Sequence, residues 1–191
     1  MNIERKSVKL LTILKIYFLR IVTPIQKLMQ EIGRDETRIT RSQVDKCMSS
    51  IKEGDILLSY ERQRITSLFI KGFWSHAAIV SSKMTVIEAV KPKVKEVDLE
   101  EWLFKKDYVC VIRPLCEEYI RKIAAANSLY YIGKDYDYTF SLDNTQIYCS
   151  ELVYLCYKDY EDFNLGKKDD ILPEAYLKTD TCKLILDTRA L

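Results

Sequence analysis

The sequence predicts an α+β fold built around a small antiparallel sheet. Short apolar runs bounded by turn residues recur through the middle of the chain, which is typical of strands. Stretches with apolar residues at helical spacing lie before and after them. The chain has 191 residues, of which 48% are hydrophobic, and only five glycines and four prolines. A chain of this length and composition can bury a core of its own as one globular domain.

The first fifty residues (1–50) are expected to form a helical extension ahead of that domain. Wound as a helix, residues 1–24 gather Lys9, Thr12, Lys15 and Arg20 on one narrow side and leave the rest apolar. We favour a helix packed on the domain; the alternative is an interfacial helix whose basic stripe faces lipid headgroups. Because charges interrupt the apolar run and no small-residue cleavage site follows, neither a signal peptide nor a membrane-spanning helix is expected.

The other elements follow from periodicity and turn signals. The expected helices cover about 41–50, 67–71, 117–131 and 150–160, and the expected strands cover about 55–60, 75–80, 85–90, 108–113 and 136–140. Thr40 is expected to cap the first of these helices. In the helix over 117–131, Ile120, Ile123 and Ala124 are expected to face inward, and Gly133 to end it.

Two of these strands are expected to pair as a hairpin with three loop residues, Ser81–Lys83. That loop pairs Val80 with Met84 and, counting back, His76 with Glu88. Residues opposite each other in an antiparallel pair share a face and lie about 5 Å apart at Cβ, so Glu88 could accept a hydrogen bond from the imidazole. A two-residue loop would instead bring the next residue of the second strand opposite His76.

His76 and Cys149 are the candidate reactive pair. His76 is the only histidine of the chain, and Cys149 stands where a loop becomes a helix. Imidazole is suited to take a proton near neutral pH, and a thiol at a helix N-terminus ionises more readily. If the two meet in space, they form a cysteine nucleophile with its base. The alternatives are a core histidine bonded to a backbone carbonyl and an ordinary buried thiol.

Charge and cysteine usage bound the partners. The formal net charge of +2 gives no sign of a nucleic-acid partner. The cysteines form no C-x-x-C pair and share one histidine, so neither a zinc site nor another metal is expected. Their places in apolar runs favour a reducing compartment, which predicts a cytoplasmic protein, with peripheral membrane contact through residues 1–24 as the alternative. The six positions are Cys47, Cys110, Cys116, Cys149, Cys156 and Cys182.

Several segments resemble one family in sequence and in order. They are Ile51-Lys52-Glu53-Gly54-Asp55-Ile56-Leu57-Leu58, Ser75-His76-Ala77-Ala78-Ile79-Val80, Val86-Ile87-Glu88-Ala89, Tyr136-Asp137-Tyr138-Thr139-Phe140 and Tyr148-Cys149-Ser150-Glu151-Leu152-Val153. Together they resemble the permuted papain-like amidases, a branch of the NlpC-like cell-wall hydrolase superfamily. The histidine precedes the cysteine, which is the order that the permuted branch shows. The resemblance covers 51–191 and implies a circularly permuted papain-like core, with the nucleophile's helix packed against the sheet.

The resemblance also implies roles for the site residues. Cys149 would be the nucleophile, His76 the base and Glu88 the residue that orients the imidazole. The reaction would be amide hydrolysis by an amidase or peptidase through a thioester acyl-enzyme, without a metal or organic cofactor. The expected substrate-binding residues are Tyr60, whose hydroxyl would lie near the oxyanion, Ser150 through its backbone amide, and Tyr148 and Asp137 in the wall of the site.

Two other functions stay open at this point. The same three residues could serve an acyltransferase or lipid hydrolase at a membrane surface, with a lipid amide or ester in place of a peptide as substrate. A non-enzymatic binding protein could also have kept the fold. The intact set of His76, Glu88 and Cys149 argues against the last, because an inactive site loses its side chains freely.

Overall fold

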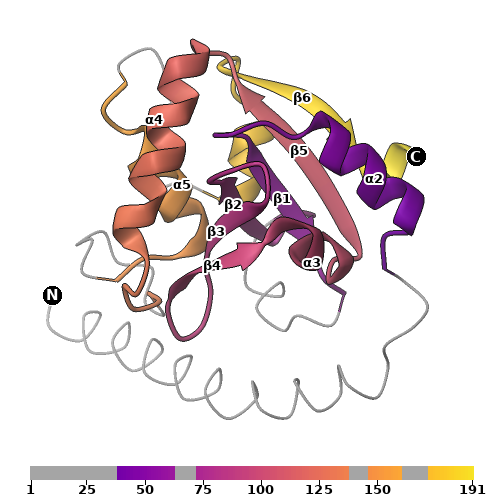
Figure 1. Cartoon of the computed structure of the whole chain (residues 1–191), viewed down its shortest axis with the longest axis horizontal. Coiled ribbons are helices and arrows are strands. Elements are labelled where there is room, and N and C mark those ends of the chain that lie inside the picture. Colours follow the sequence, from indigo (N-terminus) through magenta and orange to yellow (C-terminus); the bar gives the residue numbers. More distant parts are fainter. Residues whose placement is uncertain (1–37, 63–71, 138–145, 161–171) are drawn as a thin grey trace, which may run out of the picture.

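Six antiparallel strands form one sheet in the order β4-β3-β2-β1-β5-β6 (Figure 1). The computed structural model describes residues 38–62, 72–137, 146–160 and 172–191. The strands are β1 (Ile56–Tyr60), β2 (His76–Val80), β3 (Thr85–Ala89), β4 (Val94–Asp98), β5 (Tyr108–Pro114) and β6 (Cys182–Asp187). The described helices are α2 (Arg41–Ser50), α3 (Leu99–Phe104), α4 (Glu118–Ser128) and α5 (Cys149–Tyr157), with short 3-10 turns η2 (Leu129–Tyr131), η4 (Pro173–Leu177) and η5 (Thr188–Ala190). The expected α+β class with a small antiparallel sheet is confirmed.

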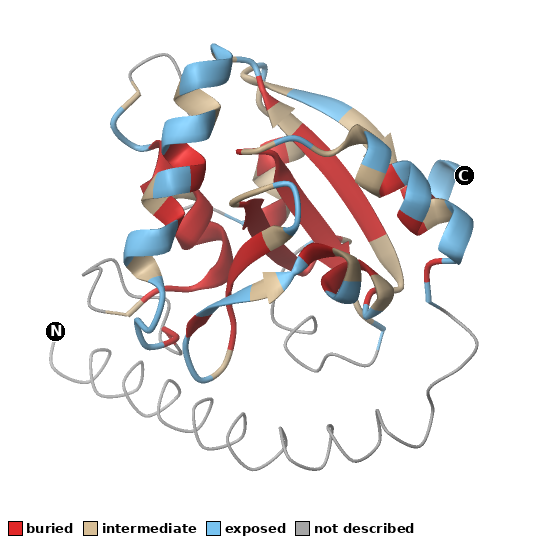
Figure 2. Ribbon diagram, in the orientation of Figure 1, coloured by how far each residue is buried: buried red, intermediate tan, exposed pale blue. Residues whose placement is uncertain are grey.

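Side-chain alternation along the strands divides the core between the two faces of the sheet. Leu58 of β1 packs in a cluster with Leu152 of α5. The residue before it in the strand, Leu57, points to the other face and packs with Trp102 of α3 and Val44 of α2. This is the period-2 pattern that buries both faces of a central strand. Figure 2 shows the result, with the central strands buried along their length. One face is therefore covered by α5 and the other by α2 and α3.

The helix predicted at 41–50 is confirmed with its cap. The backbone N–H of Gln43 donates to Oγ1 of Thr40 at 3.3 Å, and the N–H of Thr40 donates to Oε1 of Gln43 at 2.8 Å. This reciprocal pair satisfies two N–H groups that the helix itself leaves without partners. The helix also bonds to the C-terminal turn, because Nε2 of Gln43 donates to the carbonyl of Thr188 at 3.0 Å.

The helix predicted at 117–131 is present as α4 continued by η2, but its inward face differs from the expectation. Ala124 is buried as expected and Ile120 is half-buried, whereas Ile123 is 44% exposed. The buried side chains of α4 are those of Ala124, Ala125 and Ser128. Small residues let α4 approach α5 closely, so the packed stripe is rotated away from the largest side chains.

Some strands and helices differ from the expectation or lie outside the described residues. The edge strands β4 and β6 were not predicted, because charged and exposed side chains break their apolar pattern. The strand expected at 136–140 is wrong at its start: Tyr136 makes only an isolated bridge to Ile147, and 138–140 lie outside the described residues. The helix expected at 67–71 also lies outside them, as does the segment 1–24 with its packed or interfacial alternatives.

The boundary expected at residue 50 stays a prediction. The one described element ahead of it, α2, contributes Val44 and Cys47 to the core on its face of the sheet. No helix within the four described ranges has the length and apolar content that a membrane crossing requires.

Candidate active site

His76 and Glu88 meet in the structure, although by a different register from the one predicted. Nε2 of His76 lies 2.8 Å from Oε2 of Glu88, and the two residues are 3% and 5% exposed. In the β2–β3 pair, however, Val80 faces Val86 and Ala78 faces Glu88. The expected pairing of His76 opposite Glu88 is therefore wrong by two residues.

The wider loop explains both the shift and the surviving contact. The hydroxyls of Ser81 and Ser82 lie 2.8 and 2.7 Å from Oγ1 of Thr85, which closes a loop longer than the three residues expected. A shift of two residues keeps every side chain on its original face. Glu88 thus becomes the diagonal neighbour of His76, a separation that a long side chain can span. The partner of Nε2 is a carboxylate, and not the backbone carbonyl of the alternative reading.

Glu88 has two further partners that sequence reasoning missed. The indole Nε1 of Trp102 donates to Oε2 at 2.8 Å, and Nζ of Lys95 lies 3.4 Å from Oε1. Lys95 stands opposite Glu88 in the β3–β4 register, and Trp102 reaches it from α3. An acidic residue in an apolar run signals that partners exist, but their identity depends on long-range pairing.

Cys149 is the first residue of α5, as predicted, and is 3% exposed. The preceding residue, Tyr148, has extended backbone, and its N–H donates to Oε2 of Glu151 at 3.4 Å. These contacts end the loop and begin the helix at the cysteine. The helix dipole and the N–H groups of the first turn favour a thiolate at this position.

The other cysteines stand in environments that oppose ionisation. Burial raises the pKa of Cys47 to about 11 and that of Cys182 to about 12. Burial raises the pKa of Cys110 to about 12, with the charge of Asp187 acting in the same direction. Cys156, two turns along the helix that Cys149 begins, also has its pKa raised by burial. None of the six cysteines, all of which lie in the described residues, forms a disulfide.

One end of α5 is anchored beside the last residue of β2. The hydroxyl of Tyr157 donates to the carbonyl of Gly54 at 2.6 Å, and the N–H of Gly54 donates to the carbonyl of Val80 at 2.9 Å. Gly54 has φ +80°, a conformation that only glycine adopts readily. The C-terminus of the helix therefore lies at the Val80 end of the strand.

The other end of α5 is linked to the segment that leads into β2. The hydroxyl of Tyr176 donates to the carbonyl of Ser150 at 2.6 Å, and Oε2 of Glu174 accepts the N–H of Phe73 at 2.6 Å. Tyr176 and Glu174 lie two residues apart in η4, so this turn joins the start of the helix to the approach to the strand.

These two anchors make α5 and β2 run in the same direction. Their lengths match, because eight helical steps cover about 12 Å and four strand steps about 13 Å. Cys149 and His76, the first residues of the two elements, thus lie at the same end of the sheet. The contact between the thiol and the imidazole itself stays a prediction.

The expected substrate-binding residues lie around the same end. Tyr60 is half-buried at the end of β1, one residue past the pair of Ser59 with His76, and its ring stacks on Phe73 with centroids 4.6 Å apart. Asp137 is fully buried, and its N–H donates to the carbonyl of Ile147 at 3.1 Å. Ile147 lies two residues before Cys149, the first residue of α5. Their substrate contacts stay predictions.

Tyr148 and Ser150 flank the nucleophile candidate and are both buried, at 7% and 1% exposed. Tyr148 packs into the core cluster on the α5 face, and the carbonyl of Ser150 is held by Tyr176. Tyr176 was not singled out from the sequence. A tyrosine in a loop carries no signal of its own there, because its partner lies far along the chain.

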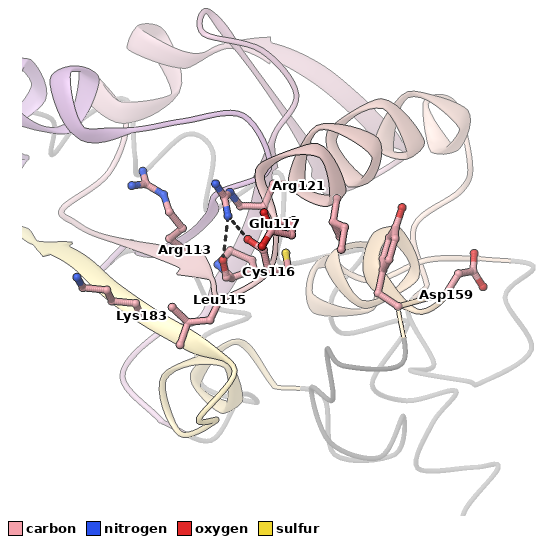
Figure 3. A pocket seen from close by; sticks show the side chains of 10 residues that line it. Arg113, Leu115, Cys116, Glu117, Arg121, Asp159 and Lys183 are labelled. Carbon is pink, nitrogen blue, oxygen red and sulfur yellow. Dashed lines mark hydrogen bonds between the residues drawn. The ribbon is translucent and has the colours of Figure 1, made fainter.

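A separate pocket of about 530 Å³ lies at the opposite end of the sheet (Figure 3). It is lined around Pro114, whereas Tyr60 pairs with the other end of β5 at Tyr108. Its two arginines are engaged: Arg113 bonds to Asp55 at 2.8 Å, and the dashed lines in Figure 3 show the Arg121 guanidinium bonded to backbone carbonyls. None of the seven predicted site residues lines this pocket.

Comparisons with known proteins found one family and its relatives. A family model described as permuted papain-like amidase enzyme, YaeF/YiiX, matches residues 50–187. The uncharacterized protein YiiX of Escherichia coli is 30% identical over 129 residues, which cover 62% of this chain and 63% of YiiX. A crystal structure of YiiX from Escherichia coli matches with a TM-score of 0.61 at 21% identity, covering 72% of this chain and 97% of that one. At that identity the likeness shows the fold alone.

That crystal structure is described as one of a metalloprotein. In the part of this chain that the structure describes, no group of three or more His, Cys, Asp and Glu side chains is placed to hold a metal ion. The match of the family model across most of the chain, together with the fold and the order of the histidine and the cysteine, shows that this protein belongs to the permuted papain-like amidase family YaeF/YiiX.

Proposed function

We propose that the protein is a cysteine hydrolase that cleaves an amide bond through a thioester on Cys149. His76 acts as the base and Glu88 orients its imidazole. The observation that carries the proposal is the buried His76–Glu88 pair, 2.8 Å apart, at the end of the sheet where α5 begins with a cysteine. Membership in an amidase family supports the reaction class.

Each step of the proposed reaction is assigned to a group of this chain. Nε2 of His76 is engaged by Glu88, so Nδ1 is the nitrogen that takes the thiol proton. The thiolate attacks the carbonyl carbon, and backbone N–H groups of the first turn of α5 stabilise the oxyanion, at about 3–4 kcal/mol for each donor. His76 then protonates the leaving amine. Water, activated by the same nitrogen, releases the acyl group from sulfur.

The two faces of the sheet set a geometric condition on this mechanism. Glu88 and Trp102 contact His76 on the side covered by α3, whereas α5 covers the opposite side. The thiol must therefore reach Nδ1 around the end of β2. His76 is the first residue of that strand, and Nδ1 is the ring nitrogen nearer the backbone, which makes such an approach feasible.

The substrate is an amide whose acyl part passes through Cys149, and a peptide is our first proposal. A lipid amide or ester is the alternative, with transfer to a second acceptor in place of hydrolysis. If the substrate is a lipid, activity should depend on residues 1–24; if it is a peptide, it should not. Activity on lipid vesicles that disappears when this segment is deleted favours the lipid, and activity on short peptides without lipid favours the amidase.

Trapping of the acyl-enzyme tests the proposal directly. The full chain is incubated with peptides and with acyl-lipid vesicles, quenched in acid, and the adduct is located by mass spectrometry of its fragments. An acyl group on Cys149, absent from Cys149→Ala and retained in Cys156→Ala, supports the mechanism. The matched control lies in the same helix, so general loss of fold is separated from loss of the nucleophile. Turnover that persists in Cys149→Ala would overturn it.

A further inference from the structure

Glu88 is held from three sides by groups that donate hydrogen bonds or carry positive charge. Oε2 lies 2.8 Å from Nε2 of His76 and 2.8 Å from Nε1 of Trp102, and Oε1 lies 3.4 Å from Nζ of Lys95. Glu88 as a whole is 5% exposed. These contacts come from three different elements, β2, α3 and β4, so they do not follow from any local motif.

The chemistry of these donors determines the state of the carboxyl group. An indole N–H donates and never accepts, and an ammonium group also only donates. Oε2 of Glu88 therefore accepts from the indole, and the ammonium 3.4 Å from Oε1 favours the ionised form of the carboxyl group. An ionised carboxylate is an acceptor only, so Nε2 of His76 must carry the hydrogen in their contact. In neutral imidazole the lone pair then lies on Nδ1.

We propose that Trp102 is a positioning residue that fixes the tautomer of His76 through Glu88. Its indole N–H, together with the Lys95 ammonium, keeps Glu88 as an ionised acceptor, and so keeps Nδ1 as the basic nitrogen. This deepens the proposed function and rests on it, because Nδ1 is the nitrogen assigned to the thiol. The helix holds Trp102 in place: Asp98 caps α3 by accepting the N–H of Glu101 at 2.9 Å.

A buried cation strengthens the same donor. Nζ of Lys106 lies 4.5 Å from the centre of the Trp102 ring and 2.6 Å from Oε1 of Glu61. Lys106 is itself 5% exposed. A cation over the face of an indole draws electron density from the ring, which makes its N–H a better donor. Simple packing of Trp102 in the core would need neither this cation nor the bond to Glu88.

The single histidine makes the tautomer directly measurable. The protein is labelled with nitrogen-15 in histidine, and the two ring nitrogens of His76 are the only imidazole signals in the chain. In the neutral state the wild type is expected to show hydrogen on Nε2 alone. Trp102→Phe keeps the aromatic volume but removes the donor, and should give a mixture of both tautomers. Alkylation of Cys149 in this variant should slow about tenfold.

Two further variants keep the test decisive. Phe104→Leu, in the same helix, controls for altered packing and should leave the tautomer unchanged. Lys95→Met, whose side chain is 54% exposed in the wild type, should fold and shift the tautomer in the same direction if Trp102→Phe does not fold. A single Nε2–H tautomer in folded Trp102→Phe, or in Lys95→Met when that variant is the one available, would overturn the inference. Failure of the proposed function is distinguishable, because it leaves alkylation insensitive to His76→Ala whatever the tautomer.

Discussion

Alkylation by iodoacetamide should single out Cys149 against the order that exposure predicts. Cys116 and Cys182 are half-buried and Cys149 is 3% exposed, so accessibility alone makes Cys149 the slower of the three. Activation by the helix N-terminus and by His76 predicts the reverse order. The two explanations therefore give opposite results in one experiment.

The pKa shifts set the size of the difference. An ordinary thiol with a pKa of about 8.5 is roughly 3% ionised at pH 7. Burial raises the pKa of Cys182 to about 12, and a thiol with that pKa is only about one part in 10⁵ ionised at pH 7. Since the thiolate is the reacting species, an activated Cys149 should react about a hundredfold faster than Cys182, because its larger thiolate fraction outweighs the lower nucleophilicity of a less basic thiolate.

The assay is a time course at pH 7 with the modified cysteines located by peptide mass spectrometry. His76→Ala should slow labelling of Cys149 and leave Cys116 unchanged, which serves as the internal control. Faster labelling of Cys116 than of Cys149, or equal rates at Cys149 with and without the imidazole, would refute the reasoning.

Three further predictions concern stability. Asp55→Asn should lower the free energy of unfolding by about 3–5 kcal/mol in urea titrations, because it breaks a buried two-bond pair with Arg113 (2.8 and 2.7 Å); a loss under 1 kcal/mol would contradict this. Gly54→Ala should lower the free energy of unfolding more than Gly133→Ala does. Both glycines have positive φ, which costs an alanine about 1–2 kcal/mol, but only the methyl group added at Gly54 would overlap the backbone of α4. Stability should fall as pH rises from about 9 toward 11, because the folded state holds the Cys47 proton more tightly than the unfolded chain, whose thiol ionises first. Urea titrations across that range should show a smaller decline in Cys47→Ala, and an equal decline would count against this cause.

Local patterns were sufficient for the elements that carry their own signals. The cap at Thr40 and the following helix depend on side chains three residues apart, and both are present. The start of α5 at Cys149 follows from the change of apolar spacing at that residue. The edge strands β4 and β6 have no such signal, because one side of an edge strand faces solvent and tolerates charge.

The register of β2 and β3 lay beyond local reasoning. The sequence predicted that Glu88 lies on the same face of the sheet as His76, and this holds because a shift of two residues preserves the face. The pairing itself depends on the loop, which the hydroxyls of Ser81 and Thr85 close. The inward face of α4 likewise depends on its contact with α5, because small side chains are buried there and Ile123 is left exposed.

The sequence by itself determined which residue types were present for the chemistry and the kind of element on which each stands. It determined this because helix caps, alternation and turn residues act over a few positions of the chain. Tertiary structure alone decided that Trp102 and Lys95 hold Glu88, and that the starts of α5 and β2 lie at one end of the sheet. Those contacts join segments far apart in the chain, and their geometry follows from the packing of the whole core.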